Sequence, residues 1–264
     1  MTEDLIVGDE LERLAVIALM ALVFAPLELL FPAVKRPQGR FQRYRTDILH
    51  ILIGGYVIRL ATIGILGWLI TLLAIPRLGA ALPLWLQVIA ILLMSDLAFY
   101  TMHRIYHAVP TLWRFHRIHH SSEHLDWLAA YRVHPVDQVV NATIIALPAF
   151  ALGFSPLALL IYATVYQWHS ILLHSNIGWT FGPVGRWVTS PRFHHWHHAN
   201  DPAAFNKNFG GQLTLWDRLF GTALERDHEP PQCGIENPPN ESFLAHMITP
   251  FTDRTNHGQP DQIL

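Results

Sequence analysis

Long apolar stretches alternate with polar segments over the first two thirds of the chain. A helix that spans a membrane needs about 20 mostly apolar residues. Stretches that approach or exceed this length lie at about residues 14–31, 48–75 and 84–100. Pro32 ends the first stretch, and a short segment with proline and glycine separates the second from the third. The pattern therefore predicts three membrane-spanning helices in this part of the chain.

A second pair of apolar stretches follows Pro135. Each has roughly 17 residues, close to the lower limit for a span, and the sequence GFSP at 153–156 separates them. Turn residues between two apolar runs predict a tight helical hairpin, made either of two short spans or of a re-entrant pair. Beyond Asn176 the chain is polar and rich in glycine and proline, so we expect no further span.

Basic residues set the expected orientation. The segment KRPQGRFQRYR at 35–45 is rich in Lys and Arg and has no acidic residue. Such loops lie on the cytoplasmic side of membranes. Counting spans from this loop places residues 106–134 and 194–198 on the same side. The N-terminus is acidic and lacks the basic region of a cleavable signal peptide, so the first stretch is expected to be an anchor.

These patterns predict an all-α fold, an integral membrane helical bundle of about three spans plus a helical hairpin, with a cytoplasmic cap of histidine-rich helices. We expect transmembrane anchor helices over residues 1–95. A core over 96–225 should include the membrane hairpin 136–173. The polar, proline-rich C-terminal tail, 226–264, is expected to pack loosely or to be disordered.

Composition narrows the function classes. Hydrophobic residues make up 51% of the chain and charged residues only 14%, against about a quarter in soluble proteins. A net charge of -2 gives no field that would recruit nucleic acid. The chain's one cysteine, Cys233, excludes an intrachain disulfide and a four-cysteine iron–sulfur cluster. Histidine is the outlier: 13 of its 17 copies fall between His103 and His198.

The histidines form three local patterns: HRIYH at 103–107, HRIHH at 116–120 and HHWHH at 194–198. Residues at i, i+3 and i+4 share one helical face, so each H-x-x-H-H triple can present three ring nitrogens to one cavity. Imidazole suits iron, zinc, copper and nickel. Eight to ten imidazoles exceed what one ion can hold, so the pattern predicts a site for two ions.

Further residues near these patterns are candidates for the same site. His134 and His174 are candidate ligands, and His195 is expected to support the ligands or to face the substrate. The residues alone leave open whether His134, His169, His174 and His195 bind a metal directly. Metal-bound imidazoles donate their second N–H to a carboxylate or carbonyl, and Asp137 is the strongest candidate for that carboxylate.

The order of these motifs resembles the fatty acid hydroxylase / sterol desaturase superfamily. The flanking sequences are similar as well: LWRFHRIHHSSEHLDWLAAYRVHP (112–135), HSNIG (174–178), SPRFHHWHH (190–198) and NFGGQLTLWDRLFGT (208–222). The resemblance covers roughly residues 96–222. It implies two iron ions, for which zinc can substitute on purification, and dioxygen as co-substrate. The implied ligands, with two additional histidines at 134 and 174, are His103, His107, His116, His119, His120, His134, His174, His194, His197 and His198.

The superfamily implies hydroxylation or desaturation of an unactivated C–H bond in a lipid, such as a sterol, a hopanoid-like lipid or a fatty acyl chain. The chain lacks a G-x-G-x-x-G loop and a haem-attachment motif. We therefore expect an external electron carrier of ferredoxin or cytochrome type, with its reductase. Candidates for its docking patch are Arg104, Arg114, Arg117 and Arg132. The excess of arginine over lysine favours a bacterial inner membrane.

Other function classes agree less well with the sequence. A membrane zinc hydrolase needs fewer histidines and a water-activating carboxylate, and the metalloprotease motif H-E-x-x-H is absent. A metal-binding transporter should place its polar ligands along the spans, whereas these histidines cluster beyond the predicted membrane ends. A haem-binding electron carrier needs paired histidines on facing spans, which the pattern lacks.

Overall fold

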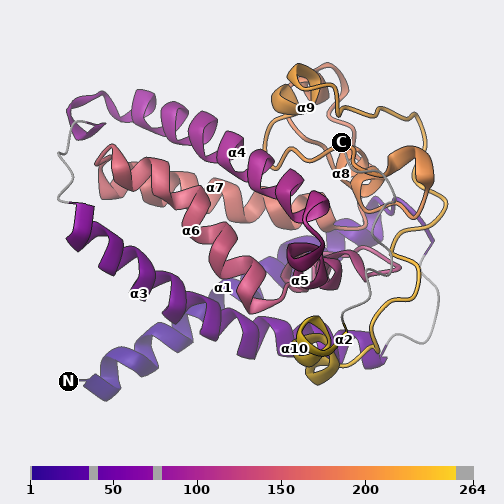
Figure 1. The fold of residues 1–264 in the computed structure, drawn as a ribbon, viewed down its shortest axis with the longest axis horizontal. Helices are drawn as coiled ribbons and strands as arrows, with labels where there is room; N and C mark the ends of the chain where they lie inside the picture. The colour runs from indigo at the N-terminus through magenta and orange to yellow at the C-terminus, as the bar shows by residue number, and fades with distance from the viewer. Residues whose placement is uncertain (1, 36–40, 74–78, 254–264) are drawn as a thin grey trace.

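The computed structural model describes residues 2–35, 41–73 and 79–253, and these ranges contain helices and loops but no regular β-strand. The predicted all-α class is therefore confirmed for this part of the chain. Long helices lie roughly along one axis and form the bundle (Figure 1). They are α1 (Thr2–Leu30), α3 (Gly55–Leu73), α4 (Leu84–Ala108), α6 (Pro135–Ala151) and α7 (Pro156–His174).

Within the described residues, α4 and α7 are the helices long and apolar enough to cross a membrane. The predicted hairpin is present as α6 and α7, and Gly153 takes a positive φ of 63° in the turn between them. Since left-handed backbone is costly for residues with a Cβ, glycine suits this tight reversal. Helix α4 packs against both hairpin helices, and α3 packs against α6.

Helix α4 runs two turns beyond the predicted end at Tyr100, as far as Ala108. The apolar pattern ends before the helix does, because HRIYH continues it with polar residues. Val109 precedes Pro110 and is extended (φ -100°, ψ 112°), as expected for a residue before proline. Pro110 then begins α5 (Pro110–His120) at its first turn, where the missing N–H costs nothing. This sharp corner places HRIYH and HRIHH side by side.

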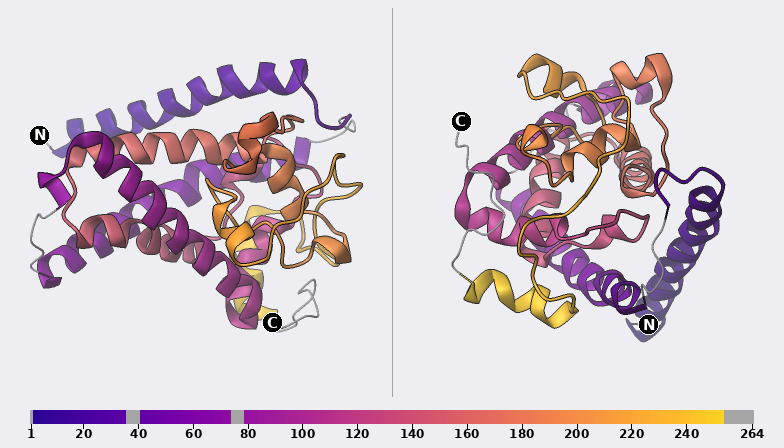
Figure 2. Two further views of the ribbon diagram at one scale, coloured as in Figure 1. Left: turned by 90° about the horizontal axis from the view of Figure 1, so that it is seen from above. Right: turned by 90° about the vertical axis from the view of Figure 1, so that its right-hand side faces the viewer.

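Most of the short helical elements surround one end of the bundle, as the end-on view in Figure 2 shows. Helix α8 (Pro191–His197) begins at an N-cap, where the Ser190 hydroxyl accepts a hydrogen bond from Phe193 N. The remaining elements are α2 (Phe41–Leu49), the π-helix η1 (His50–Gly54), the 3-10 helices η2 (Gly79–Ala81), η3 (Ala129–Tyr131), η4 (Gly182–Arg186) and η5 (Pro202–Ala204), α9 (Leu215–Leu219) and α10 (Phe243–Thr252).

The two ends of the bundle differ in chemistry. At one end, the loop before α4 meets the hairpin turn, where Gly79 N donates to Leu152 O and Ala80 N donates to Gly153 O. At the other end, Glu28 of α1 accepts hydrogen bonds from Trp127 N and Asn176 N. The C-terminal ends of α1, α4 and α7 and the helices α5 and α8 gather there (Figure 1). Every predicted histidine motif therefore lies at the same end.

Residues 226–253 of the predicted tail make specific contacts with the bundle, although many of their side chains are exposed. His246 of α10 is fully buried and lies 3.0 Å from His50, ring nitrogen to ring nitrogen. Glu229 pairs with Arg192 and with His195. Residues 254–264 lie outside the described residues, and the domain boundaries at 95 and 225 stay a prediction.

A buried arginine connects three distant segments at the histidine end. The Arg132 side chain is completely buried, donates from Nε to Asp47 Oδ1 at 2.7 Å, and forms an ion pair with Glu241. The neighbouring carboxylates raise the pKa of Arg132, so it stays charged. Arg117 is also buried and pairs with Asp253. Neither side chain is available for the predicted docking patch, because both are enclosed by the protein.

We predict that Arg132→Met lowers stability by about 3–5 kcal/mol, because it removes the buried charge that pairs with the carboxylates of Asp47 and Glu241. Thermal unfolding of the purified protein in detergent measures the change. Arg114→Met is the control, because Arg114 makes only an exposed hydrogen bond to Thr111 among the bonds described. Equal melting temperatures for Arg132→Met and the control would contradict the prediction.

Candidate metal centre

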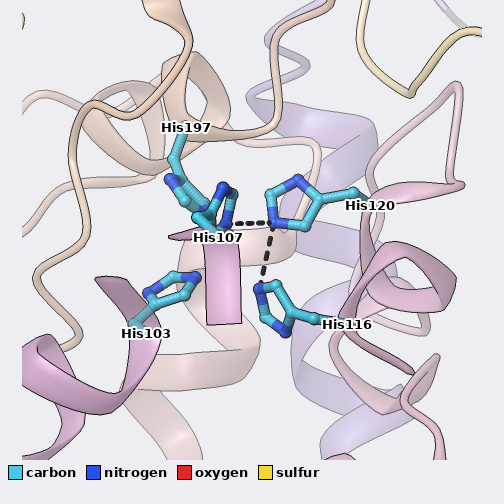
Figure 3. Close-up of side chains that lie close together, drawn as sticks. All are labelled: His103, His107, His116, His120 and His197. Atoms are coloured by element: carbon cyan, nitrogen blue, oxygen red, sulfur yellow. Dashed lines mark hydrogen bonds between the residues drawn. The ribbon is translucent and has the colours of Figure 1, made fainter. Parts of the chain in front are cut away.

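Nine buried histidines form two adjacent groups within the described residues. In each group the candidate ligand atoms lie within 4.8 Å of one another. The first group (Figure 3) consists of His103, His107, His116, His120 and His197. The second group consists of His119, His174, His194 and His198. The rings of His120 and His198 stack across the two groups with centroids 4.5 Å apart.

Each H-x-x-H-H triple contributes to both groups. In α5, His116 and His120 belong to the first group, whereas His119 belongs to the second. The arrangement is reversed at α8, where His194 and His198 belong to the second group and His197 to the first. Residues at i and i+4 lie one above the other on a helix, and the residue at i+3 is offset around it. One short helix can therefore supply ligands to two neighbouring ions.

The second ring nitrogen of several histidines is held by a backbone carbonyl. His103 Nδ1 lies 2.9 Å from Phe209 O, and His197 Nδ1 lies 2.8 Å from Lys207 O. A carbonyl can only accept, so Nδ1 carries the proton in both rings. The Nε2 atom of each neutral ring is then a bare lone pair. Both Nε2 atoms are buried without a hydrogen-bond partner among the described residues.

The decisive contact joins His119 and His174. His119 Nδ1 donates to Arg132 O at 3.2 Å, and His174 Nδ1 donates to Ser170 O at 2.7 Å. Their Nε2 atoms lie 3.0 Å apart, although neither atom has a proton to share when the rings are neutral. Burial and the neighbouring imidazoles lower the pKa of His119 well below its ordinary value, so protonation does not relieve the contact. A cation bound by both lone pairs would remove the conflict.

Other nitrogen–nitrogen distances have the same magnitude. His194 Nε2 lies 3.0 Å from His174 Nε2, and His120 Nε2 lies 3.2 Å from both His107 Nε2 and His116 Nε2. Two nitrogens bound at 2.0–2.1 Å to one ion are separated by about 2.9–3.4 Å, depending on the coordination angle. Burial also lowers the pKa of His197, to about 3, and metal binding requires neutral imidazole. Both groups therefore fit a metal ion.

Asp137 supports the first group. Its Oδ2 atom accepts a hydrogen bond from His116 Nδ1 at 2.9 Å, and both side chains are buried. Its position at the start of α6 follows from His134, whose Nδ1 caps the helix by accepting from Val136 N. Tyr106 donates to the Asp137 carbonyl at 2.9 Å. The carboxylate can thus orient the His116 ring and strengthen its Nε2 as a ligand.

His134 lies outside both groups. Its Nδ1 caps α6, and its Nε2 lies 3.3 Å from Met247 O. Both ring nitrogens are therefore used by backbone groups, and we leave His134 out of the proposed ligand set. His195 also lies outside, with Nδ1 at 2.7 Å from Glu229 and Nε2 at 3.0 Å from Ser175 O. His169 contacts Gln212 and Thr189 O instead.

A model of the fatty acid hydroxylase family matches residues 88–222. Ornithine lipid hydroxylase OlsE of Rhizobium tropici is 31% identical over 245 residues, which cover 87% of this chain and 72% of that protein. The chain belongs to the fatty acid hydroxylase family. Human alkylglycerol monooxygenase is 32% identical over 55% of the chain, and human cholesterol 25-hydroxylase is 31% identical over 50%. The resemblance inferred from the motifs is therefore confirmed.

Membership places the chain among oxidoreductases, because these relatives are hydroxylases and monooxygenases. The matched regions cover 32% of the human alkylglycerol monooxygenase and 48% of the human cholesterol 25-hydroxylase. No solved structure gave a match. The family match includes both H-x-x-H-H motifs and the segment 208–222 that follows them.

The segment 208–222 has a structural role that sequence reasoning missed. Its backbone supplies the Phe209 carbonyl that holds His103. The carboxylate of Asp217 accepts hydrogen bonds from Phe209 N and Gly210 N, which fixes this loop. A Cβ atom on Gly211 would lie 2.7 Å from the Phe99 ring, so the loop can approach α4 only with glycine there. The Asp96 carboxylate accepts hydrogen bonds from two further amides of the loop, Gln212 N and Leu213 N. The carboxylates of Asp96 and Asp217, together with Gly210 and Gly211, thus fix the Phe209 carbonyl that holds His103.

A cavity of about 220 Å³ touches both histidine groups. It lies between α3, α4, α6 and α7, and His103, His116, His119, His174 and His194 contribute to its wall. The remainder of the wall combines apolar side chains with carboxamides and tyrosines. A molecule in this cavity would contact both groups at once.

We predict that His119→Ala and His194→Ala each lower the metal content of the purified protein by about one ion per chain or more. Each substitution removes one of four converging nitrogens, which leaves the second group incomplete. Elemental analysis after purification in detergent measures the loss. His228→Ala is the matched control, because this ring is exposed and lies outside both groups. Full metal content in His119→Ala would remove this residue from the ligand set.

Asp137→Asn is expected to weaken metal retention about 10- to 100-fold, as loss of a carboxylate partner does at other metal-bound histidines. The amide oxygen still accepts a hydrogen bond, but it no longer provides a charge beside His116. Competition with a chelator measures the affinity. Asp227→Asn serves as the control, because that side chain is 98% exposed. Identical retention in the two variants would show that Asp137 does not tune the site.

Proposed function

We propose that the chain is a membrane-bound oxygenase that hydroxylates a lipid with O2 and external electrons at a pair of iron ions. The observation that carries the proposal is the set of buried, converging ring nitrogens in two adjacent groups of five and four. Hydroxylation is favoured over desaturation because the similar curated proteins are hydroxylases and monooxygenases. The buried histidine groups and the hydroxylase relatives thus support the same activity.

Iron is the metal that agrees with this activity. Imidazole nitrogen suits both iron and zinc, but zinc has no redox chemistry. When bound, an iron pair would supply the activation of dioxygen that attack on an unactivated C–H bond requires. Neither group contains a carboxylate among the described residues. Neutral ligands leave the charge of the ions largely uncompensated, which favours oxygen-derived anions at the site.

The protein itself would supply geometry and exclusion of water. Backbone carbonyls of Phe209, Lys207 and Arg132 fix three imidazoles so that Nε2 faces the centre. Every histidine in the two groups is at most 8% exposed, which keeps bulk water from the reacting atoms. The cavity beside them can position a C–H bond near both groups. Positioning of this kind lowers the barrier by converting an encounter into an intramolecular step.

We propose that the bundle crosses a bacterial inner membrane several times, with the histidine end on the cytoplasmic side. The apolar helices α4 and α7 support membrane insertion. The basic segment 35–45 begins directly after α1 at the histidine end, although its residues 36–40 lie outside the described residues. Its start is placed by Val34, which exchanges hydrogen bonds with the Asn176 side chain after α7. The positive-inside rule then places this end in the cytoplasm.

Electrons would come from a separate carrier of ferredoxin or cytochrome type with its reductase. The chain has a single cysteine, so it cannot hold a four-cysteine iron–sulfur cluster of its own. A cytoplasmic histidine end would make the metal centre accessible to a soluble carrier. Of the arginines predicted to bind the carrier, Arg104 and Arg114 remain candidates, since Arg117 and Arg132 are buried.

The substrate is proposed to be a membrane lipid with a polar head. Ornithine lipid hydroxylase OlsE matches this chain over 72% of its own length. The alkylglycerol monooxygenases also act, by their names, on lipids with hydroxyl and ether groups. A sterol, as in cholesterol 25-hydroxylase, is the less favoured class, because that protein matches 50% of the chain, whereas the ornithine lipid hydroxylase matches 87%.

Comparative lipid mass spectrometry tests the proposal. Cells that produce the wild-type protein should accumulate a lipid with one additional oxygen atom, whereas cells that produce His119→Ala should not. Cells with His228→Ala should resemble the wild type, because that ring lies outside both histidine groups. Identical lipid profiles for wild type and His119→Ala, with both proteins present in the membrane, would refute the oxygenase assignment.

A further inference from the structure

The cavity beside the histidines is too small to enclose a whole lipid. Its volume of about 220 Å³ lies below the range of roughly 300–1,000 Å³ that is typical of pockets for drug-sized ligands. Only a short segment of a long lipid can therefore lie beside the metal groups, and the remainder must extend away from them. The chemistry of the wall indicates which segment enters.

Carboxamide side chains are concentrated in this wall. An alkyl chain offers them no hydrogen bond, and a buried polar group without a partner is costly. Gln167 Nε2 donates to the Tyr131 hydroxyl at 3.3 Å, so its amide is satisfied within the protein. The carboxamides that line the cavity are Gln138, Asn141, Gln167 and Gln212. Apolar atoms still make up most of the wall, so the cavity suits a small polar group together with the hydrocarbon next to it.

Two of these carboxamides each have one polar atom without a hydrogen-bond partner among the described residues. Asn141 is 8% exposed, and its Oδ1 atom is buried without a partner within the described residues. Gln212 is 3% exposed and uses one amide atom on His169 Nδ1, at 2.9 Å, which leaves its other amide atom unsatisfied. His169 Nε2 donates to Thr189 O, so Nδ1 of the neutral ring accepts from the Gln212 amide nitrogen, and the unused atom is the Gln212 amide oxygen. Both residues can thus hydrogen-bond a ligand.

The two amides lie close to the metal groups. Asn141 follows Asp137 by one helical turn on the same face of α6, and Asp137 holds His116. Gln212 belongs to the loop that holds His103, three residues after Phe209. A ligand atom that meets Asn141 and Gln212 is therefore near the reacting centre and not at the far end of the substrate.

We propose that the cavity binds the polar end of the lipid substrate, with Asn141 and Gln212 as specificity-determining residues for a hydroxyl or amide group next to the reacting carbon. The inference rests on the proposed lipid hydroxylation and deepens it. A hydroxyl or a secondary amide donates a hydrogen bond, so it can satisfy an unused amide oxygen of Asn141 or Gln212. The hydrocarbon tail then extends away from the metals, and oxygen enters within a few bonds of the polar group.

Binding of matched probes tests the polar subsite directly. The probes are hexadecanamide, 1-hexadecanol and hexadecane, added to metal-loaded protein in the same detergent micelles. For each protein, the measured quantity is the affinity for a polar probe divided by the affinity for hexadecane. This ratio should be at least about tenfold higher in the wild type than in Asn141→Leu or Gln212→Met. Comparison with the variants cancels the different partitioning of the probes into micelles. Asn240→Leu and Gln232→Met are the controls, because both residues are exposed and lie outside the cavity.

The same preference in wild type and in both variants would overturn the proposal and would indicate that ordered water alone satisfies the amides. Equal metal content in wild type and variants verifies that the variants are folded. If Asn141→Leu does not fold, Asn141→Ser replaces it, and this variant should retain part of the preference through its hydroxyl.

The position of the added oxygen separates this inference from the proposed function. Fragmentation of the oxygenated lipid should locate the new oxygen in the headgroup or within a few bonds of a hydroxyl or amide. An oxygen near the methyl end of an acyl chain would overturn the polar-end proposal and leave lipid hydroxylation intact. A wild-type lipid profile without any oxygenated product would instead reject the proposed function, whatever the outcome of probe binding.

Discussion

The histidine end of the structure contains a repulsion that a bound cation would remove. His119 and His174 each place the single proton of a neutral ring on a backbone carbonyl, and their Nε2 lone pairs then face each other at 3.0 Å. In a buried site, water cannot screen this contact, and protonation is opposed by burial. A metal ion bound by both nitrogens would remove the repulsion. Metal binding and folding of this end would then be coupled.

Such coupling would account for the convergence of many segments at one end of the bundle. The candidate ligands come from α4, α5, α7 and α8, which are distant in sequence. Each segment is also held by contacts behind the ligands: Arg132 pairs with Asp47, and Glu28 of α1 accepts from Trp127 N and Asn176 N. An imidazole can be held at the required angle only if its partner carbonyl is equally fixed. The buried ion pair and the loop carboxylates provide that rigidity.

Much of the site could be predicted from sequence because the helical period places the histidines. The spacing of His116, His119 and His120 fixes one face of α5, and Asp137 follows His134 at the start of the next helix. The division of each triple between two groups was not predictable, since it depends on how α5 and α8 cross. The roles of Phe209 and Lys207 were equally hidden, because a backbone carbonyl is present in every residue type.

His134 shows that a sequence pattern can also predict a ligand where the structure gives the residue another role. Its sequence context resembles that of a ligand, yet the proline that follows makes it a helix cap, and Met247 O binds its remaining nitrogen. By contrast, Asn141 has no signature in the sequence, since one amide among many apolar residues is typical of a helix interior. Its significance arises from the cavity it shares with Gln212. Specificity in such a site is set by the few polar atoms that the protein leaves unsatisfied beside the metals, because a substrate that lacks the matching group leaves them unpaired.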